Sequence, residues 1–149
     1  MTAAGIILAA GNGTRMKSNL PKILHKVAGV ALVGHAVRTM RIAGIEDINV
    51  VVSSDLSDSA ELYEALLPRV KVSVQAEQLG TADALQAARS EVAGADTIIV
   101  APADVVLVTD ELIRQLLDHH ITLNSLATVL GARVDDPTGL GRIKLDDYG

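Results

Sequence analysis

The residues best suited to chemistry in this sequence lie in one loop near its N-terminus. Gly11 and Gly13 are followed by three cations, Arg15, Lys17 and Lys22, in a chain whose formal net charge is −5. Glycines let backbone N–H groups approach an anion closely, and arginine and lysine bind phosphate oxygens. A local cluster of positive charge in a protein whose net charge is negative therefore favours a phosphate-rich ligand. A solvated loop with a tight glycine turn is the alternative that composition leaves open.

The spacing in this loop excludes two well-known phosphate-binding motifs. Met16 stands where the dinucleotide fingerprint G-x-G-x-x-G requires its last glycine, and the Gly-Lys-Ser/Thr of a P-loop is missing. The chain also has no cysteine, which rules out thiolate catalysis and cysteine-based zinc sites. Phosphate binding here must use a different arrangement of glycines and cations.

The elements that position this loop follow from the hydrophobic pattern. We expect strands at about 6–10, 48–52, 70–75, 97–101 and 125–133, and helices at about 31–43, 58–68 and 81–92, with another beginning at Thr109. Alternation of strand and helix implies crossover connections and a parallel sheet. The expected fold is α/β: a doubly wound, mostly parallel sheet with helices on both faces. Ligands in such sheets bind beyond the carboxyl ends of the strands, which points to the loops 11–21, 75–81 and 102–109.

Composition narrows the class of protein further. The 149 residues, 49% of them hydrophobic, suit one domain with its own core. With 13 basic and 18 acidic residues, broad nucleic-acid binding is disfavoured. The apolar stretch before Gly11 is too short for a membrane span, and nothing predicts export. A cytoplasmic protein is expected. An open sheet edge would allow association with another copy.

Three segments carry long motifs in a fixed order. They are Leu8-Ala-Ala-Gly-x-Gly-Thr-Arg-Met-x-Ser-x-Leu-Pro-Lys-x-Leu-His25, Gln75-Ala-Glu-Gln-Leu-Gly-Thr81 and Asp135-Asp-Pro-Thr-Gly-x-Gly-Arg-Ile143. Together they resemble the N-acetylglucosamine-1-phosphate uridylyltransferase family, the N-terminal half of a bifunctional enzyme. The wider nucleotidyltransferase superfamily shares only Gly-x-Gly-x-Arg and the later Pro-Lys, so the longer version is more specific. The three motifs together extend from Leu8 to Ile143, nearly the whole chain.

The resemblance implies a role for each matched position. Arg15 and Lys22 are the implied catalytic cations, Asp104 the implied ligand of Mg²⁺, and Gly141 the implied backbone contact to the amino sugar. Nucleotide binding is implied for Leu8, Ala9, Ala10, Gly11, Gly13, Gln75, Gln78, Gly80 and Thr81.

Residue chemistry alone leaves alternatives at the later positions. Thr81 as a helix N-cap with a solvated Gln75 is one, and Asp104 as a turn former is another. Many relatives carry histidine at the position of Asp83. The family usually has Gly-Asp followed closely by proline, whereas this chain has Pro102-Ala103-Asp104-Val105-Val106, a change expected to weaken metal placement.

The implied reaction transfers a nucleotidyl group from UTP to N-acetylglucosamine 1-phosphate. It yields UDP-N-acetylglucosamine and pyrophosphate by Mg²⁺-assisted in-line attack on the α-phosphorus. A sugar phosphate brings its own nucleophilic oxygen, so the enzyme has to supply alignment and charge cancellation rather than a nucleophile. The alternatives are another sugar-phosphate nucleotidyltransferase and a nucleotide-binding or assembly module without turnover.

The resemblance also bears on how much of the domain is present. The family's remaining sugar-binding residues and its asparagine metal ligand would lie beyond Gly149. We therefore expect 1–149 to be a single nucleotidyltransferase-like domain of the Rossmann-like nucleotide-diphospho-sugar transferase type. Its nucleotide-binding part is expected to be complete and its sugar-binding part truncated.

Overall fold

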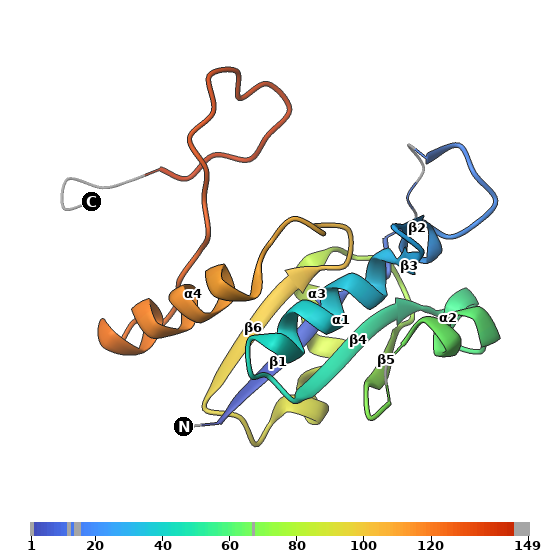
Figure 1. Ribbon diagram of the computed structural model, residues 1–149, viewed down its shortest axis with the longest axis horizontal. Coiled ribbons are helices and arrows are strands. Elements are labelled where there is room, and N and C mark those ends of the chain that lie inside the picture. The colour runs from blue at the N-terminus through green and yellow to red at the C-terminus, as the bar shows by residue number, and fades with distance from the viewer. Residues whose placement is uncertain (1, 12, 14–15, 67, 145–149) are drawn as a thin grey trace. The chain divides into compact units, whose positions relative to one another are not determined.

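The computed structural model describes residues 2–11, 13, 16–66 and 68–144. The chain divides into two compact units, one ending at Ile113 and one beginning at Arg114. The first unit contains the sheet and most of the helices (Figure 1).

The sheet of the first unit is entirely parallel. Its strands are β1 (Ala3–Leu8), β4 (Asp47–Ser53), β5 (Lys71–Gln75) and β6 (Thr97–Pro102), in the spatial order β5-β4-β1-β6. The register places Ile6 opposite Asn49 on one side and Val100 on the other. A separate antiparallel pair joins β2 (Lys26–Val27) to β3 (Val30–Ala31). The predicted parallel α/β sheet is confirmed.

Helices connect the strands, and two of them begin at a side-chain cap. The helices are α1 (Leu32–Ile42), α2 (Ala60–Ala65), α3 (Thr81–Ala87) and α4 (Asp110–Thr122), with 3₁₀ turns η2 (Lys22–Leu24), η3 (Ser54–Leu56) and η4 (Arg89–Val92). The hydroxyl of Ser59 accepts the Leu62 N–H at the start of α2, so this helix begins two residues later than the pattern predicts. Thr109 caps α4 in the same way, through the N–H of Leu112. None of the helices described combines the length and apolar character needed to cross a membrane.

The two faces of the sheet are covered by different helices (Figure 1). A side chain at Gly5 would meet the sulfur of Met40, which places α1 against that face. Ala4 and Ile6 alternate with Gly5 and form a buried cluster with Ala84 of α3 on the opposite face. Coverage on both faces explains why the strands are nearly continuous runs of aliphatic residues. The doubly wound arrangement is therefore observed.

The predicted strand at 125–133 is wrong. No strand occurs between α4 and residue 144, and Leu126 in this segment is fully exposed. A β-branched apolar run becomes a strand only when a neighbouring backbone pairs with its N–H and C=O groups, and no such pairing is found among the described residues. Further on, the Leu140 N–H donates to the Pro137 carbonyl at 3.0 Å. This bond closes a turn just before Gly141, and the described residues on either side of the turn form no strand.

Candidate functional site

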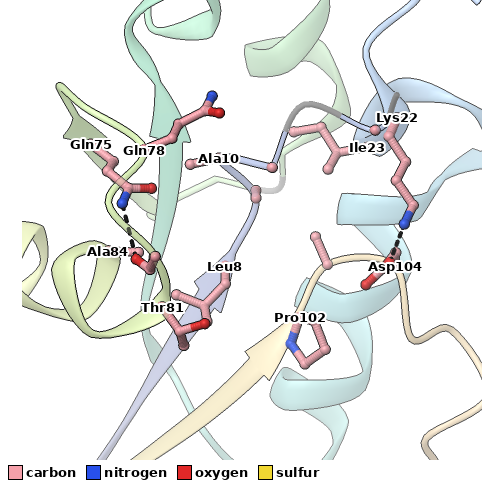
Figure 2. Close-up of a pocket in the computed structure, with 15 residues that line it drawn as sticks. Leu8, Ala10, Lys22, Ile23, Gln75, Gln78, Thr81, Ala84, Pro102 and Asp104 are labelled. Carbon is pink, nitrogen blue, oxygen red and sulfur yellow. Dashed lines mark hydrogen bonds and ion pairs between the residues drawn. The ribbon is translucent and has the colours of Figure 1, made fainter. Parts of the chain in front are cut away.

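A cavity of about 360 Å³ opens at the carboxyl ends of β1, β5 and β6 (Figure 2). The chain passes from β1 to β4 and β5 on one side and then crosses back to β6 on the other side of β1. Such a switch point leaves a crevice because the loops on either side of it diverge. The residues lining the cavity are Leu8, Ala9, Ala10, Gly11, Gly13, Lys22, Ile23, Gln75, Gln78, Gly80, Thr81, Ala84, Pro102, Ala103 and Asp104.

Most of the site residues predicted from the sequence meet in this cavity. All of the implied nucleotide-binding positions line it, as do Lys22 and Asp104. Arg15 lies outside the described residues, and Gly141 belongs to the second unit. The structure thus brings the loops after three strands to one place, while the roles of these residues remain predictions.

The loop after β1 depends on glycine at one of its two positions. Gly13 has a φ of +55°, and a Cβ built there would lie 2.6 Å from the Cβ of Lys22. Its carbonyl accepts the N–H of Met16 at 2.9 Å, which turns the chain. Gly11 has neither a positive φ nor any atom within 4 Å of an added Cβ. Gly13 is therefore required by the fold, whereas nothing in the protein itself requires Gly11.

Lys22 and Asp104 form an ion pair at the cavity (Figure 2). Lys22 opens η2, and Asp104 follows β6 by two residues. The loop carrying Asp104 is tied to β1 because the Ala103 N–H donates to the Leu8 carbonyl at 2.9 Å. With Pro102 and Ala103 before it, Asp104 still lines the cavity. The site therefore holds a cation and a carboxylate in contact, each about one third exposed.

Gln75 at the end of β5 is held by two acceptors. Its Nε2 donates to the carbonyl of Gly80 at 3.1 Å and to Oδ2 of Asp83 at 2.8 Å. The side chain is buried, with 5% exposure, so the alternative of a solvated Gln75 is wrong. The N-cap alternative for Thr81 is also wrong, because Gly80 occupies the cap and Thr81 is the first helical residue. The helix cap lies at Gly80 rather than Thr81 because the Gly80 carbonyl accepts the first helical hydrogen bond, from the Ala84 N–H, in addition to the bond from Gln75.

Several residues at the cavity were not among the predicted site residues. Ile23, Ala84, Pro102 and Ala103 line it, and Asp83 contacts Gln75 behind it. Pro102 and Ala103 adjoin Asp104, and Ile23 adjoins Lys22, so proximity in sequence to a candidate was the available signal. Asp83 lies three residues after Gly80, one helical turn away. That spacing was the signal for Asp83.

The metal-binding capacity of the site rests on Asp104. Among the described residues that line the cavity, Asp104 is the only one with a carboxylate. Within the described ranges no three His, Cys, Asp or Glu side chains cluster as a metal site would need. Mg²⁺ is commonly held by one or two carboxylates together with phosphate oxygens and water. The donor set therefore fits a cation that arrives with a phosphorylated ligand rather than one held by protein alone.

Fold and site together are typical of a nucleotide-binding domain of the nucleotidyltransferase class. A parallel sheet ends in a glycine-containing loop, and a lysine and an aspartate meet at the switch point. A family model described as the MobA-like NTP transferase domain matches residues 5–139. The chain belongs to this family.

Curated relatives place the chain more narrowly. It is 43% identical over 146 residues to the bifunctional protein GlmU of Clostridium botulinum, covering 96% of this chain and 31% of that protein. It is 39% identical over 149 residues to GlmU of Clostridioides difficile, covering all of this chain and 32% of that protein. The resemblance inferred from the motifs is confirmed. The chain spans about a third of the length of these relatives.

Solved structures support the fold. A UDP-glucose pyrophosphorylase from Acinetobacter baumanii superposes with a TM-score of 0.68 at 21% identity, over 84% of this chain and 54% of that one. A nucleotidyl transferase from Methanothermobacter thermautotroptrophicus gives a TM-score of 0.64 at 22% identity, over 79% and 57%. At this level of identity the likeness concerns the fold alone.

Proposed function

We propose that this chain is the nucleotidyl-transfer part of an enzyme that converts UTP and N-acetylglucosamine 1-phosphate to UDP-N-acetylglucosamine and pyrophosphate. Its family and its similarity to GlmU proteins, over nearly all of this chain but only about a third of their length, support a sugar-phosphate nucleotidyltransferase. The observation that supports the proposal is that the loops after β1, β5 and β6 meet in one cavity. Lys22 and Asp104 form an ion pair in this cavity, and their charges suit the binding of phosphates and of a metal ion.

The reaction asks little covalent chemistry of the protein. An anionic oxygen of the sugar phosphate attacks the α-phosphorus of UTP and forms the new P–O bond. The bond from that phosphorus to the bridging oxygen breaks, and the electron pair leaves with pyrophosphate. No proton has to be removed from the nucleophile, so the chain needs to align the reactants and offset negative charge. Lys22 provides a positive charge in the cavity for this purpose.

Asp104 is the residue that would hold Mg²⁺, together with oxygens of the nucleotide phosphates. The bound ion would supply further positive charge against the triphosphate. In the protein alone, Lys22 and Asp104 satisfy each other. Phosphate oxygens offer Lys22 an alternative anionic partner, which would release the Asp104 carboxylate for the metal. Arg15 is proposed as a second cation for the triphosphate, and Gly141 as a backbone contact to the sugar.

The direct test measures pyrophosphate release from UTP and the sugar phosphate in the presence of Mg²⁺. We expect Lys22→Ala and Asp104→Ala each to lower the rate by about 10²-fold or more, as for other preorganised charges at a reacting phosphate or carbonyl. Lys26→Ala is the matched control for Lys22, because Lys26 is exposed on β2 and does not line the cavity. Its rate should equal that of the unchanged chain.

A second candidate is a nucleotide-binding module without turnover. It is favoured by the residues before Asp104, where Ala103 stands in place of the glycine that is usual in the resembling family. Measuring UTP binding and pyrophosphate release side by side distinguishes the enzyme from the binding module. If UTP raises the melting temperature but no pyrophosphate appears, the binding module is correct; release of pyrophosphate that depends on Lys22 supports the enzyme.

A further inference from the structure

The orientation of the Gln75 amide is set by its neighbours on the helix side. Nε2 of Gln75 lies 2.8 Å from Oδ2 of Asp83 and 3.1 Å from the carbonyl oxygen of Gly80. In Figure 2 a dashed line leaves the amide nitrogen of Gln75, and the amide oxygen points away from that bond. Gln75 lines the cavity at the end of β5. The nitrogen of the amide is thus hydrogen-bonded within the protein, and its oxygen is left for a ligand in the cavity.

The chemistry of the two partners decides which end is which. A carboxylate and a peptide carbonyl are acceptors only, so both must face the NH₂ group of the amide. An amide nitrogen has two hydrogens, and two acceptors engage them. A flipped amide would direct its oxygen at the Asp83 carboxylate and the Gly80 carbonyl, and like poles would repel. Gln75 therefore offers a ligand its carbonyl oxygen, an acceptor.

Gly80 reaches Gln75 because of an unusual backbone conformation. Its φ is +110° and its ψ is −176°, a region populated almost only by glycine. The Gly80 carbonyl accepts the first bond of α3, from the Ala84 N–H at 3.1 Å, as well as the Gln75 bond. Its oxygen is therefore shared. Asp83 supplies the second acceptor and the only charged one, and charge-assisted hydrogen bonds are the stronger kind.

We propose that Asp83 is a positioning residue that selects the base of the nucleotide by fixing the Gln75 amide as an acceptor. The proposal rests on the proposed function, because it assumes that the base of UTP lies against Gln75. Asp83 itself is half-buried, does not line the cavity and acts only through Gln75.

An acceptor at this position matches uracil through a ring N–H. Uracil carries a hydrogen on N3, between two carbonyl oxygens, whereas N3 of cytosine is itself an acceptor. A base without the ring hydrogen leaves the buried Gln75 oxygen facing an acceptor or a methyl group. Leaving a buried polar group unpaired lowers affinity by about tenfold or more. The preference for uracil would then follow from the orientation of the Gln75 amide that Asp83 imposes.

The test compares UTP with 3-methyluridine 5′-triphosphate, which differs only by a methyl group in place of the N3 hydrogen. Calorimetric titration of the full chain with Mg²⁺ should show UTP binding about tenfold or more tightly than the methylated nucleotide. Asp83→Ala should weaken UTP binding about three- to tenfold and shrink the ratio between the two nucleotides, because the amide is then free to turn. Asp83→Asn should keep most of the ratio, because its carbonyl oxygen can accept the same N–H.

Two controls separate positioning from simple destabilisation. Asp58→Ala removes one negative charge at an exposed residue before α2 and should change neither affinity nor ratio. The ¹⁵N spectrum of the nucleotide-free chain reports the side-chain NH₂ of Gln75, identified by its loss in Gln75→Glu. Its hydrogens should exchange with solvent more slowly than those of Gln86, which is exposed on α3, and Asp83→Ala should abolish that difference.

The outcomes distinguish this proposal from the proposed function. If UTP binds but the methylated nucleotide binds equally well, or if Asp83→Ala keeps the ratio, the role of Asp83 is overturned and the proposed function stands. If neither nucleotide binds, the proposed function is overturned and the role of Asp83 with it. Fast exchange of the Gln75 NH₂ in the unchanged chain would overturn the role of Asp83 before any variant of Asp83 is made.

Discussion

Lys22 and Asp104 are 82 residues apart in sequence and form an ion pair at the cavity. One comes from the loop after β1 and the other from the loop after β6, so the pair joins the two sides of the switch point. Their side chains are 33% and 35% exposed. Solvent reaches both groups, and a ligand with phosphates can reach them as well.

The exposure of this pair predicts that it contributes little to folding. Lys22→Ala and Asp104→Ala should each change the free energy of unfolding by less than about 1 kcal/mol, because ion pairs open to solvent are screened. Urea denaturation of the nucleotide-free chain measures this change. Combined with the loss of pyrophosphate release expected above, it would mark the pair as functional. A loss of more than about 2 kcal/mol would instead indicate a structural role.

Gly13→Ala should destabilise the loop after β1. The substitution places a Cβ in a left-handed conformation, at 2.6 Å from the Cβ of Lys22. The cost expected for such backbone strain is about 1–3 kcal/mol, and it should appear in the free energy of unfolding from urea denaturation. UTP binding should fall as well, because Lys22 is displaced.

Gly11→Ala is the matched comparison in the same loop. Gly11 lines the cavity, but an added Cβ meets no atom within 4 Å. We expect unchanged stability and weaker UTP binding, since a Cβ hinders close approach of a ligand to the backbone. Unchanged binding would mean that no ligand lies against Gly11, whereas lost stability would contradict the open space around it.

The buried contact between Asn49 and Ser73 predicts a stability effect away from the site. Asn49 is 1% exposed, its Nδ2 donates to the Ser73 hydroxyl at 2.9 Å, and its Oδ1 has no hydrogen-bond partner among the described residues. Ser73→Ala removes the side-chain partner that the described residues give Asn49 and should cost about 1–3 kcal/mol. In an Asn49→Val background the same substitution should cost far less, because no buried amide remains. A double-mutant cycle by thermal denaturation measures the difference.

Acid should weaken the attachment of the first strand. The backbone N–H of Thr2 donates to the carboxylate of Asp96 at 2.7 Å and its hydroxyl at 3.1 Å, and these bonds hold the pKa of Asp96 below its ordinary value. A carboxyl whose pKa is lower in the folded state stabilises the protein above its unfolded pKa of about 3.9, and that contribution is lost as pH falls through the folded value. Asp96→Asn should therefore be less stable than the unchanged chain at pH 6.

The same variant supplies the check on the pH dependence. The stability difference between Asp96→Asn and the unchanged chain should shrink as pH falls below about 4, because the carboxyl of the unfolded state takes up a proton before the native one does. Thermal melts from pH 2 to pH 6 follow this difference. A gap that stays constant across the range would mean that the charge of Asp96 contributes nothing.

The features predicted correctly are those with a local cause. Strand and helix periodicities depend on neighbouring residues, so β1, β4, β5 and β6 and the helices between them could be located in advance. Parallel pairing followed from the alternation, and the cavity at the carboxyl ends followed from parallel pairing. The failed strand at 125–133 shows the limit, because its pattern was favourable but a pairing partner is a property of the assembled sheet.

The contacts within the site were decided by tertiary structure alone. The sequence determined that a glycine-containing loop with Lys22 follows one strand and that Asp104 follows another. It did not determine that their charges meet, nor that Nε2 of Gln75 selects Gly80 and Asp83 rather than solvent. Local pattern sets which backbone hydrogen bonds a segment can make. The partner of a side chain depends on which other loops the fold brings within about 3 Å, the range of a hydrogen bond.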